Sequence, residues 1–151
     1  METLTYDITS LPQLALAVEE LLVRAVNQSD GSGAVVIALS GDLGAGKTTL
    51  VQTLARRLGV TDTVTSPTFV VMKQYETTDG SFTSLIHIDA YRIEDVDEMR
   101  PLGFTSLLAE PGTLVCIEWA ERIGDLLPLH TIATTLMVDP SGKRTLTIHS
   151  T

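Results

Sequence analysis

The stretch of sequence that decides the fold is Gly41-Asp42-Leu43-Gly44-Ala45-Gly46-Lys47-Thr48, which Thr49 follows. It matches the phosphate-binding pattern G-x-x-x-x-G-K-[ST], the Walker A sequence, at every fixed position. The glycines let the backbone fold into a loop whose N–H groups converge on phosphate oxygens. The lysine ammonium offers a point charge to the β- and γ-phosphates, and the Thr48 hydroxyl offers a ligand to Mg²⁺. Residues 41–49 therefore predict a nucleotide-binding loop.

The residues on either side place this loop between a strand and a helix. Residues 34–39 form an unbroken apolar run, which is typical of a strand buried on both faces. In residues 48–58 three leucines recur at helical spacing, and Gly59 stands where a helix is expected to be capped. The N-terminus of such a helix favours an anion, because the helix dipole is positive there. The alternative is a glycine-rich turn that binds nothing, but it does not explain why strand, loop and helix follow one another in this order.

Composition predicts one α/β domain over residues 1–151. Hydrophobic residues make up 44% of the chain and charged residues 19%, as in ordinary globular proteins. No apolar run is long enough to span a membrane, and the N-terminus lacks a secretory signal, so we expect a cytoplasmic protein. The formal net charge of −9 disfavours autonomous binding to nucleic acid. Cys116 lies in an apolar run and is expected to be a buried small hydrophobe.

The remaining segments predict a mixed central β-sheet flanked by helices. Ser10 and Gln13 form a capping-box pattern at the start of a helix that runs toward Asn27. Its expected apolar face comprises Leu14, Leu16, Ala17, Val18 and Leu21. Further along the chain, the patterns predict a β-hairpin from 68–75 and 82–88, short helices in 94–109, a second buried strand at 114–117, and a C-terminal hairpin from 131–138 and 143–149.

Two acidic residues at strand ends are candidates for the second half of the site. Glu118 directly follows the apolar run 114–117, where P-loop proteins place an acidic residue beside Mg²⁺. Aspartate is commoner there, and the longer glutamate would also reach the metal through a water; an exposed strand-end carboxylate is the alternative. Asp89 ends the strand that carries His87, and alternation puts both on one side of it. Such a cluster would position an attacking water, or reach Mg²⁺ through one.

Three further features have both functional and structural interpretations. Trp119 would shield the site from water or offer a stacking face, with a core role as the alternative. Arg92 would supply charge to the transition state or contact a partner, or else pair with nearby surface carboxylates. Ser66, Pro67 and Thr68 follow the loop's helix, where many P-loop proteins sense the γ-phosphate, although their composition alone indicates only a turn.

Together the chain resembles TsaE, the bacterial ATPase family of tRNA threonylcarbamoyladenosine biosynthesis, over roughly residues 10–140. The matching blocks occur in the family's order: GDLGAGKTT at 41–49, SPTF at 66–69, HIDAYR at 87–92, DEM at 97–99, LG at 102–103, IEW at 117–119 and LP at 127–128. Ala120 departs from the pattern, because the family often has proline after the tryptophan. Its side chain is not needed for metal or phosphate binding.

The resemblance implies a small P-loop ATPase that works with two partner proteins, TsaB and TsaD. By this resemblance, TsaD carries the transferase chemistry at adenosine 37 of tRNA. ATP hydrolysis is expected to drive turnover or resetting of the complex rather than the transfer itself, and tRNA is expected to be held indirectly through the partners. Lys47 corresponds to the phosphate lysine, Thr48 and Glu118 to Mg²⁺ ligands, and Asp89 to a residue needed for hydrolysis, in contact with the metal directly or through water. The other implied positions are Ser66, Pro67 and Thr68 in a switch-like loop, Leu11 near the base, and His87, Tyr91, Arg92 and Trp119 as partner-contacting or site-supporting residues.

Two other functions stay open. Small-molecule kinases share the P-loop, but they commonly use an arginine-rich lid, and this chain has few arginines and no evident lid. A GTPase is disfavoured because no N-K-x-D sequence is present. An ATP-dependent binding module is the second alternative: nucleotide would order Ser66–Thr68 and the Asp89 segment into a partner surface, with negligible hydrolysis.

Overall fold

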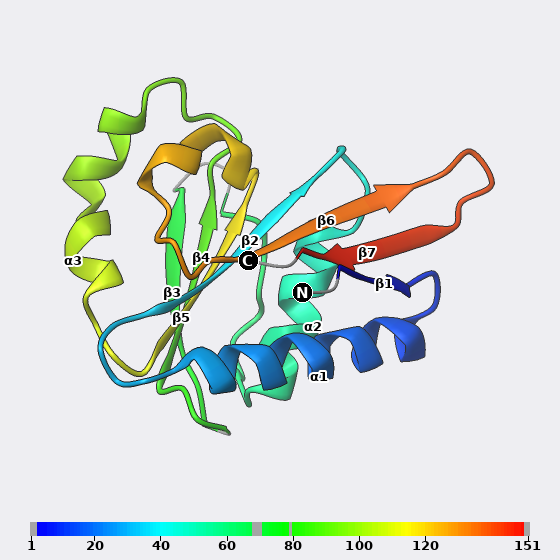
Figure 1. Cartoon of the computed structure of the whole chain (residues 1–151), viewed down its shortest axis with the longest axis horizontal. Coiled ribbons are helices and arrows are strands. Elements are labelled where there is room, and N and C mark those ends of the chain that lie inside the picture. The colour runs from blue at the N-terminus through cyan, green and yellow to red at the C-terminus, as the bar shows by residue number, and fades with distance from the viewer. Residues whose placement is uncertain (1–2, 68–70, 79, 150–151) are drawn as a thin grey trace.

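A computed structural model describes residues 3–67, 71–78 and 80–149 of the chain. Within these residues, seven strands form one mixed sheet in the order β1-β7-β6-β2-β5-β4-β3 (Figure 1). The middle of the sheet is parallel: β2 pairs with β5 and β6, and β5 pairs with β4. These strands are β2 (Val35–Gly41), β4 (Ser84–Asp89), β5 (Thr113–Glu118) and β6 (Ile132–Val138). The predicted mixed sheet is confirmed.

Antiparallel strands complete both edges of the sheet. β3 (Met72–Glu76) pairs with β4, which confirms the predicted hairpin, although residues 68–70 of its first arm lie outside the described residues. β7 (Arg144–Ile148) pairs with β6 and confirms the C-terminal hairpin. β1 (Leu4–Asp7) pairs with β7 and is not indicated by the sequence pattern. It is short, and its partner lies at the other end of the chain.

Helices cover both faces of the sheet. α1 (Leu11–Gln28) and α2 (Lys47–Arg57) pack against one face, to which β2 contributes Ile37 and Leu39. The other face is covered by η1 (Val96–Leu102), α3 (Phe104–Leu108) and η2 (Ala120–Leu126), and β2 contributes Val36 and Ala38 to it. Because β2 is buried on both faces over its first five residues, these are all apolar rather than alternating.

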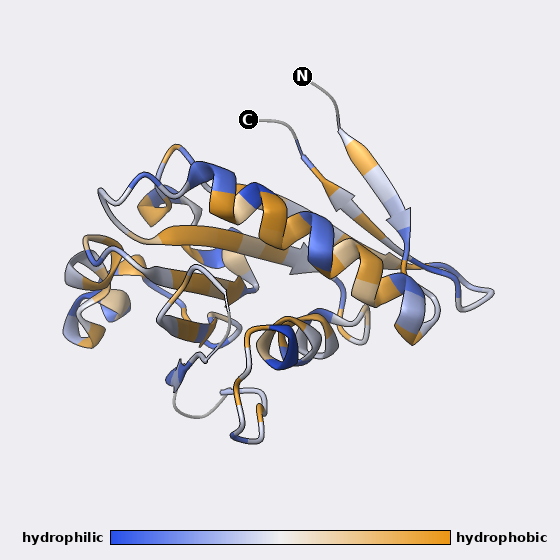
Figure 2. Cartoon of the chain, turned by 90° about the horizontal axis from the view of Figure 1, so that it is seen from below, coloured by the Kyte–Doolittle hydropathy of each residue, from blue (hydrophilic) through white to orange (hydrophobic). Residues whose placement is uncertain are grey.

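Local signals set the ends of the two long helices. The Gln13 N–H donates to the Ser10 hydroxyl at 3.3 Å, and the Ser10 N–H donates to the Gln13 carboxamide at 2.9 Å, which confirms the capping box. α2 ends just before Gly59, whose φ of 79° is left-handed. Hydrophobic and hydrophilic bands alternate around α1 in Figure 2.

The assignment of Leu16 to the buried face of α1 is wrong, since 72% of its surface is exposed. Leu16 follows the buried Leu14 by two residues, which turns it by about 200° around the helix. No helix among the described residues is both long and apolar enough to cross a membrane.

Candidate functional site

Three parallel strands end at one edge of the sheet, beside a cleft of about 540 Å³. β2 ends at Gly41, β4 at Asp89 and β5 at Glu118, and the last two residues lie opposite each other in the register. The carboxyl ends of parallel strands are the usual ligand site of such sheets. Lys47, Thr48, Asp89 and Glu118 all line the cleft. The sheet therefore brings the phosphate loop and both predicted acidic residues together.

The predicted phosphate loop, residues 41–48, joins β2 to α2 in a conformation that requires glycine. Gly41 has a φ of 140°, and a Cβ at this position would lie 2.1 Å from the Leu136 carbonyl oxygen of the neighbouring strand. Gly46, with a φ of 108°, is the N-cap of α2. The loop therefore begins in close contact with β6 and ends at Lys47 and Thr48, the first two residues of α2.

The Lys47 ammonium is folded back over its own loop. Nζ donates hydrogen bonds to the carbonyls of Gly41 at 2.6 Å and Asp42 at 2.9 Å. Burial lowers the pKa of Lys47, and nearby carboxylates, Glu118 foremost, act in the opposite direction. The carbonyls of Gly41 and Asp42 therefore hold the Lys47 ammonium against the loop.

Trp119 forms one wall of the cleft beside Lys47. Lys47 Nζ lies 4.1 Å from the centroid of the Trp119 ring, a cation–π geometry. The Trp119 ring in turn contacts Tyr91, with 4.9 Å between centroids and 52° between planes. Trp119 has a φ of 57°, a strained value for a residue with a large side chain. The ring faces the cleft and also packs against the core.

Thr48, Glu118 and His87 form a hydrogen-bonded chain. The Thr48 hydroxyl lies 2.9 Å from Oε1 and 3.0 Å from Oε2 of Glu118. His87 Nε2 lies 2.5 Å from the same Oε2. Glu118 and His87 are both buried, and Thr48 lies at the cleft. The chain thus links the first turn of α2 to the ends of β4 and β5.

Asp89 connects the cleft to the predicted switch-like loop. The Ser66 hydroxyl donates to Oδ2 of Asp89 at 3.1 Å, and the Tyr91 N–H donates to Oδ1 at 2.9 Å. The Asp89 N–H donates to the carbonyl of Val71, just after that loop. Pro67 lies beside Ser66 in the described part of the loop, whereas Thr68 lies outside the described residues. Ser66 and Asp89 line the cleft together.

The structure places the other predicted residues at different distances from the site. Leu11, with 66% of its surface exposed, lines the cleft at the start of α1. Leu43 and Thr49 also line it, while Ala45 of the loop is buried. Arg92 is exposed and is not among the residues that line the cleft.

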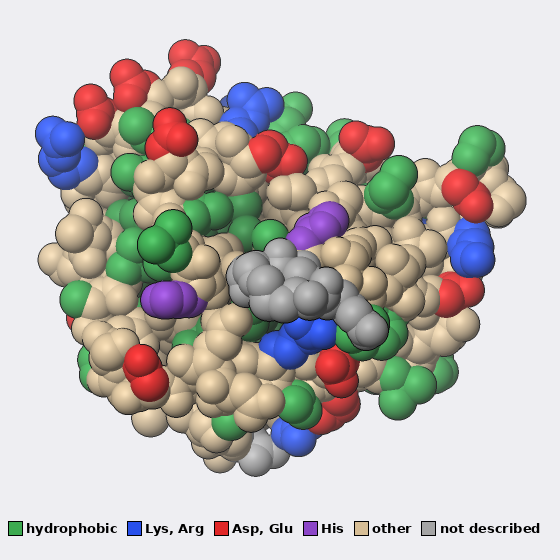
Figure 3. All heavy atoms as spheres, viewed as in Figure 1, with side chains coloured by type: hydrophobic (Ala, Val, Ile, Leu, Met, Phe, Trp, Pro, Cys, Tyr) green, Lys and Arg blue, Asp and Glu red, His purple; other side chains and the backbone are tan. Residues whose placement is uncertain are grey.

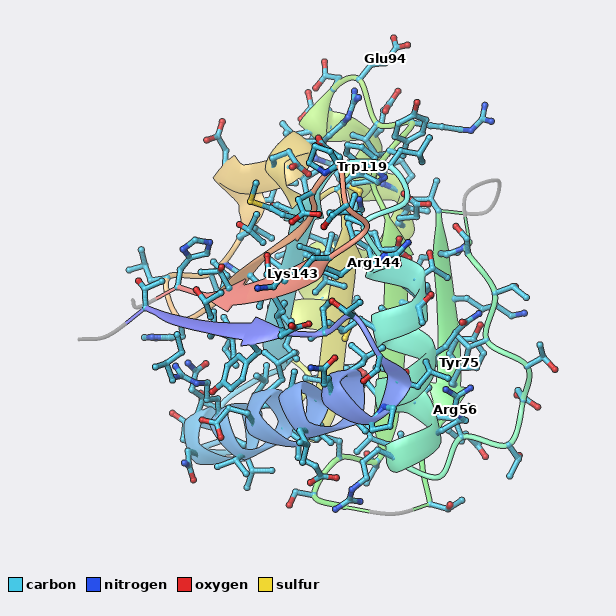
Figure 4. All side chains as sticks on the ribbon, turned by 90° about the vertical axis from the view of Figure 1, so that its right-hand side faces the viewer. Arg56, Tyr75, Glu94, Trp119, Lys143 and Arg144 are labelled. Atoms are coloured by element: carbon cyan, nitrogen blue, oxygen red, sulfur yellow. The ribbon has the colours of Figure 1, made fainter. Side chains whose placement is uncertain are left out.

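Arg144 lies at the cleft, and sequence reasoning missed it. Its guanidinium donates to the carbonyl of Gly44 at 3.4 Å, and its backbone N–H donates to the Thr9 hydroxyl at 3.0 Å. Figure 4 shows Arg144 and Trp119 toward the N-terminal end of α2 and Arg56 toward its other end. The only signal in the sequence is a basic pair, Lys143-Arg144, after the turn of the last hairpin.

Comparison with known proteins identifies similar chains. The family model of threonylcarbamoyl adenosine biosynthesis protein TsaE matches residues 12–146. A relative named tRNA threonylcarbamoyladenosine biosynthesis protein TsaE, from Treponema pallidum, is 39% identical over 114 residues, which cover 75% of this chain and 80% of the relative. A protein of the same name from Haemophilus influenzae is 30% identical over 131 residues, covering 85% of this chain and 78% of that one.

A solved structure has the same arrangement of elements. The crystal structure of YdiB from Bacillus subtilis superimposes with a TM-score of 0.68 and a sequence identity of 26%, covering 97% of this chain and 84% of that one. The likeness extends over nearly the whole sheet and its helices.

Proposed function

This chain belongs to the TsaE family of threonylcarbamoyl adenosine biosynthesis proteins, and from that membership and the cleft we propose that it binds and hydrolyses Mg²⁺–ATP in support of tRNA modification. The observation that carries the ATPase assignment is the meeting of Lys47, Thr48 and Glu118 at the start of α2. These three side chains offer a cation, a hydroxyl and a carboxylate to one small volume, the set that a metal-bound polyphosphate requires.

The side chains at the cleft are too few to hold a metal ion alone, but they suit Mg²⁺, which takes further ligands from the substrate and from water. Mg²⁺ is usually held by one or two carboxylates together with substrate phosphates and waters. Thr48 and Glu118 would be its protein ligands, with Asp89 as a further carboxylate that contacts it directly or through water. When bound, Mg²⁺ would neutralise negative charge on the β- and γ-phosphates.

The residues of the chain have separate tasks in this proposal. The loop N–H groups and Lys47 bind and orient the phosphates. Asp89 holds a water for attack, since its carboxylate lies at the cleft and is fixed by Ser66 and by the Tyr91 N–H. The Trp119 ring covers Lys47 and limits access of bulk water to the phosphates.

The base of ATP would lie at the apolar end of the cleft. Ile8, Leu11 and Leu14 line that end, near the start of α1. Arg144, between this end and the phosphate loop, would contact the phosphates or ribose. With this assignment the nucleotide would lie along the cleft, with its base near α1 and its phosphates at the loop.

A role in a larger assembly fits the charge of the chain. Acidic side chains are spread over the face seen in Figure 3, where basic ones are few and separate. With a net charge of −9, the chain would repel a polyphosphate backbone, so we propose that tRNA is held by TsaB- and TsaD-type partners. Hydrolysis would then reset that complex. A γ-phosphate in the cleft would change the contact between Ser66 and Asp89, and through it the surface that the Ser66 loop presents to a partner.

Phosphate release by the purified protein tests the proposal, first alone and then with TsaB- and TsaD-type partners and tRNA. We expect slow release alone and faster release with the partners, with Lys47→Ala inactive in both. Partner-independent phosphorylation of a metabolite would instead identify a kinase. Tight ATP binding without turnover in every mixture would identify a binding module, the second candidate, which the Ser66–Asp89 contact also supports.

A further inference from the structure

His87 is a buried histidine in contact with Glu118. Its side chain has no exposed surface, and Nε2 lies 2.5 Å from Oε2 of Glu118. The second ring nitrogen, Nδ1, is buried and has no hydrogen-bond partner among the described residues. Burying a polar ring inside a sheet is unfavourable unless the ring is paired, and an apolar residue would pack there at lower cost. The single strong contact to Glu118 therefore calls for an explanation.

The contacts decide which ring nitrogen carries hydrogen. A carboxylate oxygen only accepts hydrogen bonds, so Nε2 is the donor toward Oε2. A hydrogen on Nδ1 instead would leave a buried N–H unpaired and would set the Nε2 lone pair against the carboxylate. The His87 ring is thus held with its hydrogen on Nε2, aimed at one oxygen of Glu118.

The sheet register explains how the ring reaches this oxygen. His87 lies opposite Cys116 in the parallel pairing of β4 with β5, and Asp89 lies opposite Glu118. His87 is therefore two residues behind the strand end, on the side of the sheet that faces the cleft. Its imidazole reaches forward to Glu118 from beneath, and Thr48 contacts the same carboxylate from α2.

We propose that His87 is a positioning residue that fixes the Glu118 carboxylate for Mg²⁺–ATP. The proposal rests on the function proposed above, in which Glu118 is a Mg²⁺ ligand. By holding Oε2, the Nε2–H restricts rotation of the carboxylate, whose two oxygens both lie within 3.0 Å of the Thr48 hydroxyl. The carboxylate is then ordered before the metal arrives, so less rotational freedom is lost on binding. Loss of such a partner typically lowers metal affinity about 10–100-fold.

Three substitutions at His87 separate positioning from packing. His87→Phe keeps a ring and removes the donor, and His87→Asn keeps polarity but ends short of Oε2. His87→Gln keeps an N–H near the position of Nε2. His149→Phe is the matched control, because His149 pairs with Thr135 and does not line the cleft.

Calorimetric titration of a non-hydrolysable ATP analogue, at a series of Mg²⁺ concentrations and without Mg²⁺, measures the effect. Mg²⁺ should increase the affinity for the analogue, and we expect His87→Phe and His87→Asn to need at least about tenfold more Mg²⁺ to reach half of this increase. Their magnesium-free affinity should stay at the wild-type value, and His87→Gln should recover most of the loss. Electron paramagnetic resonance of bound Mn²⁺ gives a second reading of metal affinity that does not depend on turnover.

The outcomes distinguish this inference from the proposed function. A wild-type protein that binds no analogue, or binds it without regard to Mg²⁺, contradicts the proposed function itself. Wild-type Mg²⁺ dependence in a folded His87→Phe or His87→Asn protein overturns the positioning role alone. Thermal unfolding shows which variants are folded, and if His87→Phe is not, His87→Asn decides. A loss that His87→Gln does not recover also overturns the inference, because only the donor is proposed to matter.

Discussion

The Thr48 hydroxyl lies within 3.0 Å of both carboxylate oxygens of Glu118, although 70 positions separate the two residues in the sequence. Thr48 is in the first turn of α2, and Glu118 is the last residue of β5. The hydroxyl has one hydrogen to donate, and the carboxylate accepts it. The two proposed Mg²⁺ ligands therefore satisfy each other in this structure, while Lys47 is satisfied by loop carbonyls.

This division between metal and phosphate contacts predicts different losses from two substitutions. Glu118→Ala and Lys47→Ala should each lower ATP hydrolysis about a hundredfold or more, because Lys47→Ala removes a cation from the phosphates and Glu118→Ala removes a ligand of the Mg²⁺ that would neutralise them. Lys47→Ala should also weaken nucleotide binding about tenfold or more through the lost charge-assisted bond. Glu118→Ala should spare magnesium-free binding, since it leaves the phosphate loop intact. Phosphate release and analogue titration measure the two effects.

Glu110→Ala is the control for loss of a carboxylate, because Glu110 is exposed and does not line the cleft. It should match the wild type in both assays. Wild-type hydrolysis in either Glu118→Ala or Lys47→Ala would refute their proposed roles.

Arg144→Ala should weaken ATP-analogue binding several-fold to about tenfold, because a guanidinium at the cleft forms a charge-assisted bond with a bound anion. The neighbouring Lys143→Ala removes the same charge from an exposed position outside the cleft and should have little effect. Fluorescence or calorimetric titration compares the two. If both variants bound the analogue equally well, Arg144 would only form its hydrogen bond to the Gly44 carbonyl and would not contact the ligand.

Gly41→Ala should destabilise the protein by about 3 kcal/mol or more, because the new methyl group meets the Leu136 carbonyl and the residue must keep a φ of 140°. Gly142→Ala separates these causes. Gly142 also has a positive φ, of 90°, but nothing lies within 4 Å of a Cβ there. It should cost only about 1–2 kcal/mol. Urea unfolding measures both, and equal losses would disprove the close approach of β2 to β6.

Cys116 should not react with thiol reagents in the native protein at pH 8. It is fully buried, and burial raises the pKa of its thiol to about 12, so the reactive thiolate is scarce at that pH. In urea the thiol regains an ordinary pKa of about 8.5 and should be labelled rapidly. Absorbance from a disulfide reagent, with and without urea, follows the reaction. Rapid stoichiometric labelling without urea would contradict the buried position.

Much of the fold could be predicted from local patterns. The capping box at Ser10, the apolar run of β2 and the leucine spacing of α2 each act over a few residues, and the structure confirms the elements they indicate. β1 could not be predicted, because its four residues gain their stability by pairing with β7 at the far end of the chain. The misplaced Leu16 shows the same limit: an apolar residue near a buried stripe need not belong to it.

By itself, the sequence determined that a glycine-rich loop joins a buried strand to a helix, because glycine conformations and apolar periodicity are properties of adjacent residues. The tertiary structure decided which distant residues meet that loop. The register of β4 and β5 brings Asp89 opposite Glu118 and sets His87 beneath the carboxylate. The C-terminal hairpin carries Arg144 to Gly44, 100 positions away in the sequence. Strand order and register fix such contacts, and they depend on how the whole sheet buries its two faces.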